Sequence, residues 1–198
     1  MYYIIMKIAI YSCNFGNYRN ELKRNIDDIK YDKKIDYFFF TDSSNIKSKY
    51  WKIIIPKKEK ELEFMNQNRH TSKVTKFLIP EIIKPYDIII WIDNKSIKRI
   101  NFKYEKILEL IENNEYNINF IKHSKRINSR QEIRITMKLN LENKHYGWKF
   151  INKIKEIKFN THLPDTKCII YKNRIENINL FKAVSYTHLR AHAVSYTH

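Results

Sequence analysis

Glycine is almost absent from this chain of 198 residues, which contains only Gly16 and Gly147. The dinucleotide-binding and P-loop motifs need several glycines close together, because their backbones approach phosphate groups closely. The sequence therefore excludes both motifs. Cysteine is equally scarce, since only Cys13 and Cys168 are present. Two cysteines alone cannot complete a four-ligand zinc site. We interpret the N-terminal stretch as a strand rather than an export signal, so no disulfide is expected.

Long apolar runs are also missing, and none reaches the roughly 18 residues that would indicate a transmembrane helix. Basic residues outnumber acidic ones, with 38 Lys and Arg against 21 Asp and Glu, which gives a net charge of +17. One interpretation is a nucleic-acid-binding domain, because clustered basic residues neutralise phosphates. The other is compositional, because the lysines are spread along a chain rich in Ile, Asn and Tyr. We favour the second and expect no specific nucleic-acid partner.

Residues 183–198 differ from everything before them. The six-residue word AVSYTH begins at Ala183 and again at Ala193, and the segment contains no Lys, Ile or Asn. Such a shift predicts a foreign, unstructured tail, whose three histidines we do not interpret as a metal site. We therefore expect one domain over residues 1–182, continuing in the natural protein beyond Lys182.

The tail interpretation predicts that deleting residues 183–198 changes the melting temperature by no more than about one degree, because segments without packing contacts contribute little to stability. Differential scanning calorimetry of both chains measures this. A drop of many degrees would show that the tail belongs to the fold.

Strand and helix patterns alternate along the chain, which predicts a single α/β domain. Short runs of Ile, Tyr, Phe and Trp predict strands at Ile4–Ser12, Asp36–Thr41, Trp51–Ile55, Ile88–Ile92, Ile118–Ile121 and Cys168–Tyr171. Amphipathic spacing predicts helices at Arg19–Tyr31, Arg69–Ile83, Tyr104–Glu112, Ser129–Leu141 and Trp148–Ile157.

Polar residues follow three of the predicted strands. Asn14 follows the first strand, Asp42 follows the second, and Asp93 follows the apolar run Ile88–Ile92. Ligands of α/β sheets bind beyond the carboxyl ends of the strands, so these positions predict a binding site. Strand ends are commonly polar in any protein, and a simple turn at Asp93 is the alternative.

The helix that leads into the Asp93 strand is basic. Arg69, Lys73 and Lys76 are three or four residues apart and therefore share one helix face. This face could bind an anionic ligand or could simply be solvated.

These segments together resemble one known family. The stretches IAIYSCNFGNY, DYFFFTDS, RHTSKVTKFLIPEIIKPYDIIIWIDNKSI and HSKRINSRQEI follow one another in the order found in the glycosyltransferase-like family catalogued as domain of unknown function 616, which includes plant TOD/MUCI-type proteins and bacterial relatives. The more specific parts are the R-x-x-x-K-x-x-K helix leading into WID, and the block of His123, Arg126 and Glu132. The resemblance covers Ile8 to about Tyr171.

The resemblance implies a GT-A-like fold, which is the mixed sheet of nucleotide-diphosphosugar transferases flanked by helices. It also implies a D-x-D motif that holds a divalent cation, manganese or magnesium, on the donor diphosphate. Asp93 matches the first aspartate of that motif, but Lys95 stands at the second. A metal at Asp93 is therefore doubtful, because such cations need several oxygen ligands. Lys95 could neutralise the diphosphate directly instead.

The resemblance thus implies a glycosyltransferase that moves a sugar from a nucleotide-sugar donor to a glycan or cell-surface polysaccharide. It assigns catalysis to Asp93, His123 and Glu132. The residues expected to bind the donor are Asn14, Phe15, Gly16, Asp42, Arg69, Lys73, Asp93, Lys95 and Arg126. Alternatives are a non-catalytic relative that binds a nucleotide sugar or glycan, and a basic nucleic-acid-binding domain. We expect a cytoplasmic protein, with a membrane-peripheral location as the alternative.

Overall fold

The computed structural model describes residues 5–17, 20, 25–56, 67–99, 101–122, 131, 134, 138 and 164–183. The chain divides into one compact unit formed by Met1–Asn119 with Lys167–His198, and a second formed by Phe120–Thr166. Most described residues belong to the first unit, which holds the core of the sheet and the residues discussed below. Of the tail, only Ala183 is described; residues 184–198 lie outside the described residues.

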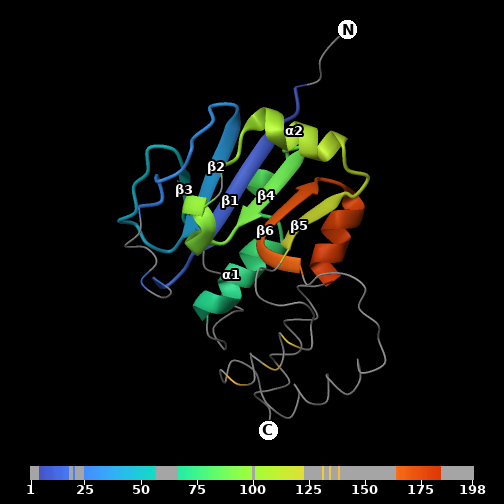
Figure 1. The fold of residues 1–198 in the computed structure, drawn as a ribbon. Helices are drawn as coiled ribbons and strands as arrows, with labels where there is room; N and C mark the ends of the chain where they lie inside the picture. The colour runs from blue at the N-terminus through green and yellow to red at the C-terminus, as the bar shows by residue number, and fades with distance from the viewer. Residues whose placement is uncertain are drawn as a thin grey trace. The chain divides into compact units, whose positions relative to one another are not determined.

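The described chain forms an α/β fold around a six-stranded mixed sheet with strand order β3-β2-β1-β4-β6-β5. Strands β3, β2, β1 and β4 pair with one another in parallel in that order, whereas β6 runs antiparallel to β4 (Figure 1). The strand bounds are β1 Ile8–Asn14, β2 Ile35–Thr41, β3 Lys52–Ile54, β4 Ile88–Ile92, β5 Ile118–Lys122 and β6 Pro164–Lys172. The α/β class and the mixed sheet confirm the coarse prediction from sequence.

Strand β1 lies between β2 and β4, and all seven of its residues are buried. Side chains alternate between the two faces of a strand. Ile8 and Ile10 therefore belong to one apolar cluster, while Ala9, Tyr11 and Cys13 belong to the cluster on the opposite face. A strand buried on both faces needs an almost continuous apolar sequence, which β1 and β4 both have.

Helical segments cover both faces of the sheet. Residues of α1 (Gln67–Phe77), the 3-10 helix η3 (Glu81–Ile83) and a helix over residues 175–183 pack in the cluster that contains Tyr11. Residues of the 3-10 helix η4 (Asn94–Arg99) and α2 (Tyr104–Glu112) pack in the cluster that contains Ile10. The sheet is thus the middle of three layers.

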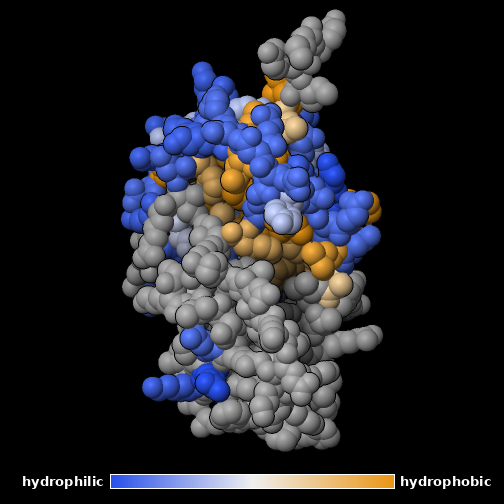
Figure 2. Space-filling model, turned by 45° about the vertical axis from the view of Figure 1, so that its right-hand side comes forward, coloured by the Kyte–Doolittle hydropathy of each residue, from blue (hydrophilic) through white to orange (hydrophobic). Residues whose placement is uncertain are grey.

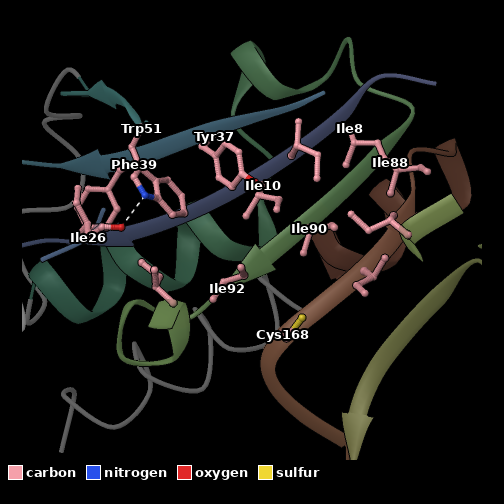
Figure 3. Close-up of a cluster of buried hydrophobic side chains, with 14 of the residues drawn as sticks. Ile8, Ile10, Ile26, Tyr37, Phe39, Trp51, Ile88, Ile90, Ile92 and Cys168 are labelled. Carbon is pink, nitrogen blue, oxygen red and sulfur yellow. Dashed lines mark hydrogen bonds between the residues drawn. The ribbon is translucent and has the colours of Figure 1, made fainter. Parts of the chain in front are cut away.

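The cluster on the α2 side is closed by Trp51 (Figure 3). The Trp51 indole Nε1 donates a buried hydrogen bond of 2.8 Å to the carbonyl of Ile26, and its ring meets Tyr37 and Phe39 edge to face. The Ser48 hydroxyl meanwhile donates to the Asp27 carboxylate. These contacts hold the loop that precedes β2 against the loop that joins β2 to β3.

The structure corrects several predicted elements. The first strand begins and ends later than predicted, and residues 25–31 do not form the predicted helix. The Asn25 side chain instead accepts the backbone N–H of Asp27 at 2.9 Å, a local bond that competes with helix formation. The predicted helix Arg69–Ile83 is divided, because α1 ends at Phe77 and Pro80 precedes a separate 3-10 turn.

Other predictions agree with the structure or fall outside it. Strand Ile88–Ile92 and helix Tyr104–Glu112 have the predicted bounds, and the final strand is longer than predicted. The helix over residues 175–183 was not predicted. Residues 148–157 lie outside the described residues, as does most of the predicted helix at 129–141.

The described surface is mostly hydrophilic in the view of Figure 2, with a smaller apolar area exposed among the charged residues. Among the described residues, no helix has the length and hydrophobicity required to cross a membrane. The large apolar side chains that remain exposed in the described part of the chain are Ile5, Tyr31, Ile55, Ile82, Leu110, Tyr116, Phe120, Ile175 and Leu180.

The central position of β4 predicts a strong dependence of stability on Ile90, which is 0% exposed. Ile90→Ala should lower the free energy of unfolding by about 2–5 kcal/mol, because it removes buried apolar contacts and leaves a cavity. The matched control is Ile55→Ala, since Ile55 is 54% exposed and should change stability by about 0.5 kcal/mol or less. Urea unfolding measures both, and equal losses would contradict the assignment of β4 to the core.

Candidate functional site

The topology brings the ends of β1 and β4 together at one edge of the sheet. From β1 the chain proceeds to β2 and then β3 on one side, and it returns to place β4 on the other side of β1. This reversal creates a topological switch point between β1 and β4. In open α/β sheets, the crevice beyond the carboxyl strand ends at such a point is the usual place for a ligand.

Asp93 follows β4 at this edge, and its carboxylate lies between two lysines. The Lys76 ammonium is 3.3 Å from Asp93 Oδ1, and the Lys95 ammonium is 3.8 Å from Asp93 Oδ2. The Trp91 indole also donates to Asp93 Oδ1, at 3.0 Å. One carboxylate and two ammonium groups leave this cluster, which we call the Asp93 cluster, with a net positive charge.

Burial distinguishes the two lysines. The Lys76 side chain is 10% exposed, whereas Asp93 is 28% exposed and Lys95 is 43% exposed. A buried ammonium needs a counter-charge, and Asp93 supplies one to Lys76. Lys95 is the member of the cluster with most access to solvent and therefore to a ligand.

Helix α1 holds Lys76 in place. The Tyr11 hydroxyl of β1 donates a 2.7 Å hydrogen bond to the Lys76 carbonyl, and the Cys13 thiol lies 3.8 Å from the Ser72 carbonyl. The Lys76 ammonium also lies 5.2 Å from the centroid of the Trp91 ring, within range of a cation–π contact. The basic helix is therefore attached directly to the two strands that form the switch point.

The loops after β1 and β2 are attached to one another. The backbone N–H of Gly16 donates to both carboxylate oxygens of Asp42, at 3.0 Å each. Gly16 has a φ of 62°, a left-handed conformation that glycine adopts without steric cost. Asp42 thus fixes the turn that follows β1, while the neighbouring Phe15 is 3% exposed and belongs to the core.

Two buried polar atoms at this edge have no hydrogen-bond partner among the described residues. They are Oγ of Ser12, in β1, and Nδ2 of Asn94, which directly follows Asp93. Buried polar atoms are normally satisfied by protein, water or ligand. The Asn94 amide therefore keeps a hydrogen-bond donor that the described side chains do not use.

The Asp93 cluster does not fit a divalent cation. Mg²⁺ and Mn²⁺ prefer several oxygen ligands, but the Asp93 carboxylate already accepts from Trp91 and pairs with two ammonium groups. Within the described part of the chain, no group of three or more His, Cys, Asp or Glu side chains could hold a metal ion.

Only some of the predicted site residues come together in the structure. Asp93 and Lys95 lie in one cluster, joined by Lys76 of the basic helix face. Asp42 contacts the Gly16 backbone, and Asn14 is buried at the end of β1.

Several other predicted site residues are described only in part or lie outside the described residues. Lys73 lies in α1 at intermediate exposure, and for Arg69 only the helical backbone is described. The predictions for His123, Arg126 and Glu132 lie outside the described residues.

The sequence predicts Lys76 on the basic helix face without assigning it to the donor site. It predicts Trp91 only as part of the apolar strand Ile88–Ile92. A signal for both was present in the spacing. Lys76 follows Lys73 by three residues, and Trp91 is two residues before Asp93, on the same face of β4.

Comparison of the chain with family models and with curated proteins finds no match.

Burial controls the chemistry of Cys13, which is 6% exposed under α1. Desolvation raises the pKa of its thiol from 9.0 to about 12, although the hydrogen bond to Ser72 and the charge of Lys76 act in the opposite direction. The nearby Asp93 carboxylate adds to the rise. The thiol therefore stays protonated at neutral pH and is a poor nucleophile.

We predict that Cys13 resists alkylation in the native protein. At pH 8 its thiolate population should be about a thousandfold below that of a thiol at its ordinary pKa. In Cys168→Ala, which leaves one thiol, iodoacetamide labelling followed by mass spectrometry should be slow in buffer and complete in guanidinium. Rapid native labelling would contradict the burial of Cys13.

Proposed function

We propose that this protein is a glycosyltransferase that binds a nucleotide-sugar donor at the β1–β4 switch point. The observation that supports this most strongly is the Asp93 cluster, in which one carboxylate and two lysines meet at the carboxyl ends of the parallel strands. The resemblance to the glycosyltransferase-like family, carried by the segments around Asp93, supports the same function. A glycan is the proposed acceptor.

The charges of the cluster suit the chemistry of sugar transfer. The bond between the anomeric carbon and the diphosphate oxygen breaks, and its electron pair stays on the diphosphate. A bond forms between the anomeric carbon and an acceptor oxygen, whose proton passes to a base. Lys95 would stabilise the negative charge that develops on the leaving diphosphate, since a fixed cation near developing charge lowers the barrier.

Asp93 has a different role in this proposal. Its carboxylate would accept hydrogen bonds from hydroxyl groups of the donor, while Lys76 keeps the carboxylate oriented. The base considered from sequence is Glu132, and His123 would contact the diphosphate or an acceptor hydroxyl; both roles remain predictions.

A nucleic-acid-binding function is supported less well. Single-stranded nucleic acids bind to exposed aromatic side chains on which the bases stack. Phe38, Phe39 and Phe40, the densest aromatic run, are 2%, 0% and 3% exposed and lie in the core. A non-catalytic sugar-nucleotide-binding protein would share the Asp93 cluster, and only a measurement of turnover separates it from an enzyme.

The test is the effect of Asp93→Asn on nucleotide-sugar binding and turnover. A panel of nucleotide sugars should raise the melting temperature of the wild type, and the donor identified should be consumed with release of its nucleoside diphosphate. Asp93→Asn should weaken binding or transfer by about tenfold or more, since hydrogen bonds to charged groups contribute about 1.5–3 kcal/mol.

The matched control is Asp28→Asn, because Asp28 also pairs with a lysine, Lys98, but is 59% exposed and belongs to no cluster at the strand ends. Circular dichroism should show both variants folded. At temperatures where Asp28→Asn is folded, its affinity for the nucleotide sugar should equal that of the wild type. If Asp93→Asn binds and turns over the donor as the wild type does, Asp93 is a turn residue and the proposed donor site is wrong.

A further inference from the structure

We propose that the Asp93 cluster binds the donor diphosphate directly through lysine ammonium groups, without a divalent cation. The inference rests on the proposed nucleotide-sugar site, but it concerns how that site neutralises the diphosphate. In the alternative, a metal ion bridges the carboxylate and the phosphate oxygens. In the metal-bridged alternative a metal cation must contact the Asp93 carboxylate, whereas in direct binding the only cations that contact that carboxylate are the lysines.

The Asp93 carboxylate is already engaged. Its Oδ1 accepts from the Trp91 indole at 3.0 Å and from the Lys76 ammonium at 3.3 Å. A cation bound at this oxygen would displace Lys76 or lie against it. Displacement would separate an ammonium that is only 10% exposed from Asp93, and breaking a largely buried ion pair is costly.

The second carboxylate oxygen faces another cation. The Lys95 ammonium is 3.8 Å from Oδ2, a separation longer than a hydrogen bond. Lys95 therefore adds positive charge at the oxygen that a metal ion would use, while its three N–H donors are not held by a short bond to Asp93. An anionic diphosphate oxygen can accept hydrogen bonds from this ammonium group.

The backbone keeps Lys95 at this position. The N–H of Ser96 donates to the Asp93 carbonyl at 2.8 Å, and the N–H of Asp93 donates to the Lys167 carbonyl at 2.7 Å. Both bonds fix the turn between β4 and η4. Lys95 is therefore presented at the strand end by a constrained segment, so less entropy is lost when its ammonium binds a phosphate.

The first experiment is calorimetric titration of uridine, cytidine, adenosine and guanosine diphosphates into the wild type, once with chelator and once with manganese. At least one should bind, with a Kd that differs by less than about threefold between the two conditions. Affinity that disappears in chelator and returns with manganese would overturn this inference while leaving the proposed function in place. Absence of binding in both conditions would overturn both.

The second experiment compares Lys95→Ala with Lys98→Ala. Both lysines lie in η4, at 43% and 50% exposure, and both have an aspartate within 4 Å. Loss of the Lys95 charge should weaken diphosphate binding by about 10- to 100-fold with chelator and with manganese alike, the scale of a charge-assisted hydrogen bond. Lys98→Ala should bind as the wild type does. Equal affinities of wild type and Lys95→Ala would overturn the inference.

Lys76→Met gives an independent readout. Without Lys76, Asp93 has lost its closest counter-charge and should repel a diphosphate in chelator, while manganese should restore part of the affinity. Metal dependence should therefore appear in Lys76→Met and be absent from the wild type. Circular dichroism establishes that the variant is folded. A folded variant that binds without metal as tightly as the wild type would contradict the role of Lys76.

Discussion

The parallel pairing of β1 with β2 on one side and β4 on the other is the constraint on which the rest of the structure depends. It requires β1 to be apolar on both faces, and it determines which helices pack against each face. It also places the residues after β1, β2 and β4 at a common edge. Asp42 can therefore contact Gly16, 26 positions away in sequence, and Asp93 can meet the helix that packs on β1.

Strand existence was predictable because apolar, β-branched and aromatic runs are short and bounded by polar residues in this chain. The bounds of β4 and α2 were correct for that reason. The helix predicted over residues 25–31 was wrong. Residue spacing suggests a helix there, but it cannot reveal that the Asp27 carboxylate accepts hydrogen bonds from Ser48 and Lys49 of a loop distant in sequence. Helix periodicity likewise placed Arg69, Lys73 and Lys76 on one face without identifying which of them reaches Asp93.

Burial decided which residues near the strand ends are available to a ligand. Phe15 belongs to the resemblance-based donor set, yet its ring lies in the core, where it packs rather than faces solvent. Conversely, Lys76 contacts both Asp93 and the Trp91 ring, so its charge is held by strand and helix together. The electrostatics of the site therefore depend on the packing of α1 as much as on the residues at the edge itself.

The short strand β3 has a consequence for the solution behaviour of the protein. It is three residues long and last in the strand order on its side of the sheet. An exposed sheet edge can pair with another chain and begin aggregation. Here Lys52 pairs with Asp36 of the adjacent strand, and Pro56, two residues beyond the strand, lacks an N–H for a further ladder bond. Because this edge strand is short and has a charged side chain and a nearby proline, a second chain could form few backbone hydrogen bonds with it.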